Sequence, residues 1–259
     1  MIARIFADMG TGPGALLVLL LAGHVLGDFL FQTEWMAREK EKCWGPLLLH
    51  TVVVLLTHAA VLAPFLTSRL AVGLLFLAAT HFLLDALRIR AFGTWGASPG
   101  AFLLDQTLHA MAVLVLWGLL ASPTGFSVVR WIPSAEWVAW YARWLGVAAG
   151  YVFVAVGGSR IVKGVLDRFH EAVPNERSDG RQYAMGRVIG YLERFIALTL
   201  VLFDQWAALG LIIAAKSIAR FPEFSDPEHK DFAEYYLLGT LASILVAVVA
   251  GVLLRLLLG

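Results

Sequence analysis

Long apolar runs separated by short polar segments dominate the sequence. A helix needs about 20 mostly apolar residues to cross the hydrocarbon core of a bilayer. Seven runs come close to that length or exceed it, and they cover residues 14–33, 46–66, 69–87, 101–121, 137–158, 188–214 and 234–258. Because a helix satisfies its own backbone hydrogen bonds in lipid, the pattern predicts an all-α, polytopic transmembrane helix bundle of about seven spans.

Composition indicates that lipid is the solvent of this bundle. The chain of 259 residues is 59% hydrophobic and 15% charged, whereas soluble domains carry about 25% charged residues. With a mean hydropathy of +0.76, we expect a multi-pass protein whose partner is the lipid bilayer, in a bacterial inner membrane. The formal net charge of +1 gives no reason to expect nucleic-acid binding. A single cysteine, Cys43, excludes an internal disulfide and a cysteine-based metal cage.

Lysines and arginines in the polar segments predict the orientation of the spans. Cations follow the first run at residues 38–42, the third run at residues 88–90 and the fifth run at residues 160–187, and these segments lie on one side of the bundle. The opposite segments hold fewer cations. The positive-inside rule therefore predicts the N-terminus outside and the C-terminus in the cytoplasm, with the reverse topology as the alternative.

Polar residue types divide the predicted bundle into two halves. Residues 1–121 form a four-helix half rich in histidine and aspartate. Residues 122–259 form a three-helix half that carries a charged cytoplasmic loop at 163–187. We expect chemistry in the first half, where five of the seven histidines lie between residues 24 and 109.

Histidines and aspartates of the first half recur at one spacing and at one depth. Three pairs are separated by four residues, which places both side chains on one helix face: His24 and Asp28, His81 and Asp85, Asp105 and His109. His50 and His58 add two imidazoles to the second span. With the predicted topology, most of these groups lie in a band about 12 Å thick near the cytoplasmic ends of four helices. Scattered polar residues have no reason to share a depth.

This depth makes a bound cation the favoured interpretation. An ionised Asp in the centre of a membrane helix costs about 2.5–3.5 kcal/mol on insertion scales, and a divalent ion turns such carboxylates into ligands. We therefore predict a divalent metal, Zn, Mn or Fe, as one or two ions. The expected ligands are His24, Asp28, His50, His81, Asp85, Asp105 and His109. Two alternatives stay open, a hydrogen-bonded network that only joins helices and a proton relay without metal.

Further polar residues suggest how such a centre works. His50 or His58 is a candidate ligand or general base, and Gln106 is placed to orient a water molecule. Arg88 and Arg90 follow Asp85 and are predicted to hold an anionic head group or phosphate, with Arg194 of the sixth span as a further anion-binding candidate. We find no phosphate-binding glycine-rich loop and no nucleophile elbow, which argues against a nucleotide-driven pump and covalent serine catalysis.

The chain as a whole resembles a bacterial multi-pass membrane family catalogued as a domain of unknown function. The resemblance covers nearly the whole chain and rests on residues 24–32, 49–50, 81–85, 105–109, 186–194, 215–221 and 234–240. It implies a membrane bundle and no particular activity. More locally, the helices with His and Asp four residues apart resemble membrane-bound metal-dependent hydrolases and the sites of cation-diffusion zinc transporters.

Together these patterns predict a metal-dependent membrane hydrolase that acts on a lipid or phosphoester at the cytoplasmic face. A metal ion there makes hydroxide available near neutral pH. One alternative is a transporter or channel for a metal ion or proton, although polar residues thin out toward the exterior side. Another is a structural membrane module.

Overall fold

The computed structural model describes residues 12–91, 98–121, 134–167, 180–219 and 230–258. All of the regular secondary structure in these ranges is helical, which confirms the all-α prediction for them. Within these described ranges, six segments are long and apolar enough to cross a membrane: 13–30, 44–61, 68–90, 99–120, 135–166 and 234–258. The chain forms two compact units, one made of residues 1–152 and 256–259 and the other of residues 153–255.

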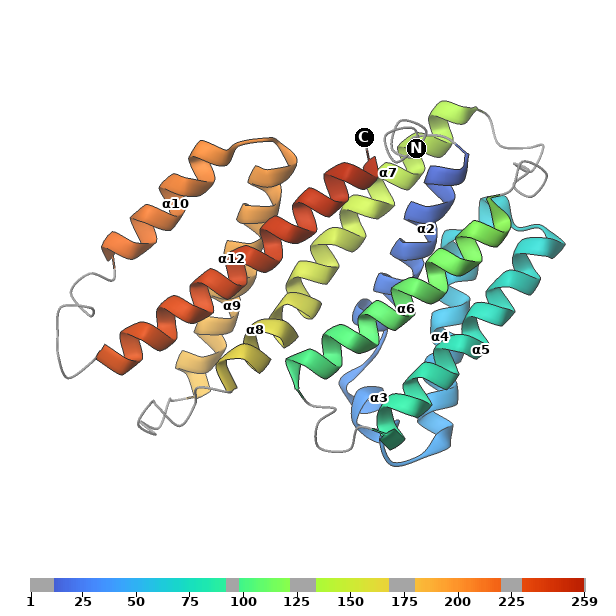
Figure 1. Ribbon diagram of the computed structural model, residues 1–259, viewed down its shortest axis with the longest axis horizontal. Helices are drawn as coiled ribbons and strands as arrows, with labels where there is room; N and C mark the ends of the chain where they lie inside the picture. The colour runs from blue at the N-terminus through green and yellow to red at the C-terminus, as the bar shows by residue number, and fades with distance from the viewer. Residues whose placement is uncertain (1–11, 92–97, 122–133, 168–179, 220–229, 259) are drawn as a thin grey trace. The chain divides into compact units, whose positions relative to one another are not determined.

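The first unit is built around its first helix. It contains α2 (Pro13–Val25), a π-helical turn η1 (Leu26–Leu30), α3 (Glu34–Glu39), α4 (Trp44–Val61), a 3-10 turn η2 (Ala63–Phe65), α5 (Ser68–Ala91), α6 (Pro99–Leu120) and α7 (Ala135–Val152). Of the segment 13–30, 78% is buried, against 22–39% for the spans formed by α4, α5 and α6. α2 accordingly lies among α4, α6 and α7, as Figure 1 shows. The predicted functional division at residue 121 stays a prediction, while by packing α7 belongs with the first unit.

Local sequence signals set the ends of the helices that surround the site. The Ser98 side chain accepts a hydrogen bond from the Ala101 amide at the start of α6, and Pro99 follows at a position where a missing N–H costs nothing. In the same way, the Thr33 side chain accepts from the Met36 amide and begins the short helix α3. α3 then turns the chain so that Lys40 at its end is buried.

The outward faces of the first unit are apolar. Large side chains such as Leu56 of α4, Val72 of α5 and Leu119 of α6 are 60–66% exposed. A soluble protein does not leave such continuous apolar faces in water. These faces fit the hydrocarbon environment that the hydropathy predicts.

The second unit differs from the sequence prediction at the sixth span. It contains a π-helical turn η4 (Phe153–Gly157), α8 (Gly158–Leu166), α9 (Gly180–Leu202), α10 (Trp206–Ala219) and most of α12 (Lys230–Leu258). Residues 188–214 are not one helix, because the chain turns at Asp204, whose backbone φ of 60° is left-handed. α10 then returns alongside α9 (Figure 1).

The predicted charged loop at 163–187 is also shorter than expected. α8 continues to Leu166 and α9 begins at Gly180, so both ends of the predicted loop are helical. Residues 168–179 lie outside the described residues. The irregular-loop prediction was based on charge, Pro and Gly content, which did not show how far the neighbouring helices extend.

Candidate metal centre

Four helical segments of the first unit bring the predicted histidines and aspartates together at one end of the bundle. Asp28 comes from η1 at the end of α2, His50 from the first half of α4, Asp85 from the second half of α5, and Asp105 from the first half of α6. These helices alternate in direction (Figure 1), and contacts among the four side chains and Gln106 show that they lie together. All seven predicted ligands and His58 are buried.

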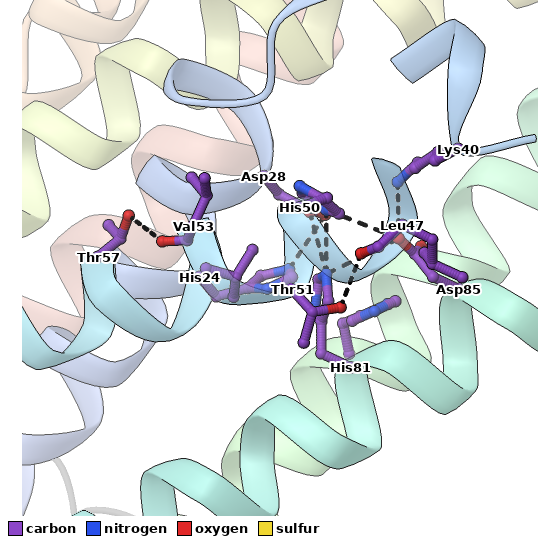
Figure 2. A network of polar contacts seen from close by, with 12 residues as sticks. His24, Asp28, Lys40, Leu47, His50, Thr51, Val53, Thr57, His81 and Asp85 are labelled. Carbon is purple, nitrogen blue, oxygen red and sulfur yellow. Dashed lines mark hydrogen bonds and ion pairs between the residues drawn. The ribbon is translucent and has the colours of Figure 1, made fainter. Parts of the chain in front are cut away.

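The centre of the cluster is formed by Asp28, His50 and His81. The Oδ1 atom of Asp28 lies 2.9 Å from Nε2 of His50 and 3.5 Å from Nε2 of His81. The two Nε2 atoms lie 3.1 Å apart. Figure 2 shows the three side chains pointing toward one another from different helices. Three ligand atoms with these spacings can share one cation.

These spacings fit a transition-metal site. Atoms that bind a tetrahedral zinc ion at about 2.0–2.2 Å lie roughly 3.3–3.6 Å from each other, a few tenths of an ångström from the distances observed. A hydrogen-bonded arrangement is the alternative, in which protons on the Nε2 atoms of His50 and His81 are directed at Asp28 or at the other ring. A cation in place of these protons would meet all three lone pairs at once.

A second group of ligand atoms shares His81 with the first. His81, Asp85 and His109 also approach one another closely enough to hold a cation. The Oδ2 atom of Asp85 lies 3.6 Å from His50 Nε2 and 3.9 Å from His81 Nε2, so the two groups are adjacent. The geometry accommodates either one ion with neighbouring carboxylates or two ions.

A lysine that the sequence analysis did not assign to the site lies against this second group. Lys40 Nζ donates a hydrogen bond to Asp85 Oδ2 at 2.6 Å, and its side chain is 5% exposed. Figure 2 shows it reaching down from the end of α3. The sequence placed Lys40 among the loop cations that orient the bundle. Only the fold of residues 31–43 over the end of the helices reveals its position.

Gln106 joins three of the predicted site residues. Its Nε2 donates to Asp28 Oδ2 at 3.1 Å and to Asp105 Oδ2 at 3.2 Å, and His24 Nε2 lies 3.3 Å from its Oε1. Because Gln106 holds one carboxylate oxygen of Asp28, the other oxygen faces the imidazoles. Hydrogen bonds to the part of a ligand that does not face the metal fix the orientation of the ligand and raise metal affinity. The predicted role of Gln106 in orienting water stays a prediction.

His58 and His109 each present an unpaired ring nitrogen to the interior of the site. The Nδ1–H of His58 donates to the Val54 carbonyl at 2.9 Å, and that of His109 donates to the Asp105 carbonyl at 2.8 Å. Their Nε2 atoms are buried and have no hydrogen-bond partner among the described residues. Both rings line a cavity of about 10 Å³, large enough for about one water molecule. An anchored Nδ1–H with a free Nε2 is the usual arrangement of a metal-binding histidine.

The charges of the cluster favour a cation. The carboxylates of Asp28, Asp85 and Asp105 are buried, and the cations that face them in the described part of the first unit are Lys40 and Arg88. If all three carboxylates are ionised and the imidazoles are neutral, one negative charge is left without a counter-ion. A buried carboxylate without compensation is costly, and a divalent ion supplies that compensation.

The three predicted anion-binding arginines lie in different environments. Arg88 faces the cluster, with Nε 3.6 Å from Asp105 Oδ1. Arg90 instead lies over the ring of Trp44, 3.9 Å from its centroid. Arg194 belongs to the second unit, where it donates to the hydroxyls of Ser243 and Ser159. Its predicted role in substrate binding stays a prediction.

The described residues define a class, a helical protein with a buried histidine–aspartate cluster and, in the part that the structure describes, six segments that can cross a membrane. Residues 16–139 match the family described as Protein of unknown function (DUF3307), which confirms the predicted family resemblance for this part of the chain. The matched segment includes every residue of the cluster. No curated protein and no solved structure matches the chain.

Proposed function

We propose that the protein is an integral membrane metalloenzyme that hydrolyses a lipid or phosphoester at the cytoplasmic face of a bacterial inner membrane. The observation that carries the proposal is the convergence of Asp28 Oδ1, His50 Nε2 and His81 Nε2 within 2.9–3.5 Å of one another in a buried site. The proposed metal is Zn, Mn or Fe, because mixed imidazole and carboxylate ligands suit these ions.

In such a hydrolase, different side chains of the site have different roles. Asp28, His50 and His81 hold the ion, and Gln106 and Lys40 hold the carboxylates in place. A bound divalent ion supplies hydroxide at neutral pH. The free Nε2 atom of His58 accepts a proton within the site, and Arg88 faces it with a cation for an anionic substrate. For the first unit the predicted orientation is proposed, with the N-terminus outside and the histidine–aspartate end of the helices in the cytoplasm.

Hydrolysis is favoured over transport because the core of the first unit is apolar beyond the histidine–aspartate cluster. The buried side chains from Ala15 to Ala22 of α2, Leu62 to Phe65, and Leu70 to Leu77 of α5 are apolar. A transported cation would have to pass this core, where no described residue of the first unit offers a buried carboxylate or imidazole. The ligands are therefore gathered at one end and not arranged along a path.

Metal content of the detergent-purified protein tests the proposal. We expect the wild-type chain to hold one or two ions after incubation with Zn, Mn or Fe. Asp28→Asn should weaken metal binding by at least about tenfold, since it removes the charged oxygen at the centre of the cluster. Glu39→Gln is the matched control, because Glu39 pairs with Lys42 at the surface. Wild-type protein without stoichiometric metal would overturn the proposal.

Activity is measured on the metal-loaded protein. A panel of phospholipids and phosphoesters is tested, and we expect the wild-type protein to hydrolyse at least one of them. Asp28→Asn should lose this activity, and Glu39→Gln should retain it. Metal-loaded protein that hydrolyses none of the panel but moves the ion into proteoliposomes would replace hydrolysis by transport. If neither occurs while His24→Ala and His109→Ala variants merely unfold more easily, the cluster serves structure alone.

A further inference from the structure

A basic groove lies beside the metal centre, on the other side of Lys40. It has a volume of about 60 Å³, room for roughly four water molecules. The turn between α3 and α4 forms one wall, and the last two turns of α5 form the other. Lys40, Lys42 and Arg90 line it, together with Trp44 and the lone cysteine, Cys43.

Arg90 is held in a position to bind an anion. Its guanidinium lies over the Trp44 ring at 3.9 Å, and that ring is stacked on Phe82 at 5.9 Å. Stacking fixes the plane of the guanidinium and leaves its edge, with the N–H donors, free. Arg90 makes no ion pair within the part of the chain that the structure describes. It is thus an oriented cation without a carboxylate partner.

The start of α4 adds a second feature that favours an anion. Cys43 at the N-cap of α4 makes no side-chain cap, and the first turn of α4 holds no acidic residue. Pro46 in this turn has no N–H, so the attraction for negative charge comes from the helix dipole and the amides of Trp44 and Gly45. Three carboxylates lie nearby: Glu41 lines the groove, Glu39 is paired with Lys42 at 2.8 Å, and Asp85 is paired with Lys40 at 2.6 Å. Arg90 is therefore the groove cation that is left for an anion.

From these observations we propose that the groove binds the phosphate of an anionic phospholipid head group. It lies at the end of apolar helices, where head groups meet the protein. Lys40 joins the groove to the metal centre, since the same side chain lines the groove and donates to Asp85. Binding of the head group needs no metal. The groove's further role, as the place where the phosphate of the hydrolysed substrate is held, rests on the proposed function.

The cysteine in the groove allows a direct test. The rate of Cys43 alkylation by N-ethylmaleimide is measured in nanodiscs of phosphatidylcholine, with and without phosphatidylglycerol, and with inorganic phosphate. We expect phosphatidylglycerol to slow alkylation about tenfold, the protection that a ligand gives at ten times its dissociation constant. Arg90→Gln should abolish the protection, while Arg38→Gln, which removes a cation of α3 outside the groove, should keep it.

Each result has a defined meaning. Equal protection in Arg90→Gln would reveal a general effect of surface charge and overturn the site, as would no protection in the wild type. Full protection by inorganic phosphate in phosphatidylcholine would assign the groove to free phosphate and overturn the lipid assignment. Without added metal, Asp28→Asn should keep the protection that the wild type shows under the same conditions, so failure of the metal proposal and failure of the groove proposal are distinguishable.

Discussion

Gly23 makes room for the deepest histidine of the cluster. A Cβ atom added at Gly23 would lie 2.8 Å from Cδ2 of His58, inside the contact distance of two carbon atoms. The ring of His58 is anchored on the Val54 carbonyl and faces the small cavity between the imidazoles. The position of this ring therefore depends on a glycine one turn before Asp28.

We predict that Gly23→Ala destabilises the protein by about 1–3 kcal/mol, because overpacking forces the His58 ring from its place. Thermal unfolding in detergent measures the effect. Gly118→Ala is the matched control, since nothing lies within 4 Å of the added Cβ on α6. Equal midpoints for the two variants would contradict the close packing of α2 and α4 at His58.

Lys40 and Asp85 form a buried ion pair, and this pair would compete with the proposed metal for one carboxylate oxygen. We predict that Lys40→Met lowers the stability of the metal-free protein by about 3–5 kcal/mol, because it leaves a buried carboxylate unpaired. Added Zn²⁺ should then raise the unfolding midpoint more than in the wild type. Lys42→Met, which removes an exposed lysine, is the control. Identical zinc-induced shifts in all three proteins would argue against competition at Asp85.

Some residues of the site follow from the sequence and others do not. The four-residue spacing of His24 and Asp28 and of His81 and Asp85 placed each pair on one helix face, and hydropathy placed the pairs at one depth. Hydropathy and spacing carry no information on how the segment after α2 folds back, so from the sequence Lys40 is predicted only to be a loop cation. For the same reason, the different environments of Arg88 and Arg90 were not foreseen.

At the scale of elements, Asp28 is presented by a π-helical turn at residues 26–30 and not by a regular α-helix. π-helical turns often occur at functional sites, because an extra residue in the turn changes the direction of a side chain. Gly27, within the same turn, allows close approach to α4, where an added Cβ would lie 3.2 Å from the Val54 Cα. Periodicity predicts a helix here, but the type of turn depends on this packing.

The turn between α9 and α10 gives a prediction for the second unit. Asp204 has a left-handed backbone, and its side chain accepts from Trp206 Nε1 at 2.7 Å and pairs with Arg255. Asp204→Ala should lower the unfolding midpoint most, because it removes both contacts and disfavours the positive φ. Asp204→Gly should be intermediate, since it relieves the backbone alone, and Asp204→Asn should be closest to the wild type. If Asp204→Ala and Asp204→Asn have equal unfolding midpoints, the turn depends neither on the side-chain contacts of residue 204 nor on its backbone preference.

At the scale of the whole molecule, the reversal between α9 and α10 changes how many times the chain can cross the membrane. A continuous helix at 188–214 would cross the membrane once, whereas α9 and α10 reverse direction at residues 203–205. Long apolar helices were predictable because hydropathy averages over about 20 residues. The reversal was not, because two polar residues, Asp204 and Gln205, hardly change such an average.

Cys43 tests the predicted orientation, since it is exposed and is the only cysteine of the chain. We predict that a membrane-impermeant maleimide labels it in inverted membrane vesicles and not in intact spheroplasts, which places the metal-centre end in the cytoplasm. Leu66→Cys in a Cys43→Ser background lies at the other end of α4 and should give the opposite result. Labelling of Cys43 from outside would establish the reverse topology.

Because Lys40 contacts Asp85 and also lines the basic groove, binding at the two places is thermodynamically coupled. One ammonium group is shared by the carboxylate of Asp85 and the wall of the basic groove. A phosphate that draws this group away frees a metal ligand, so lipid binding would tighten metal binding. By reciprocal linkage, metal must then tighten lipid binding by the same factor, and each tenfold gain is worth about 1.4 kcal/mol. Titrating either ligand in the presence of the other would therefore reveal positive heterotropic cooperativity.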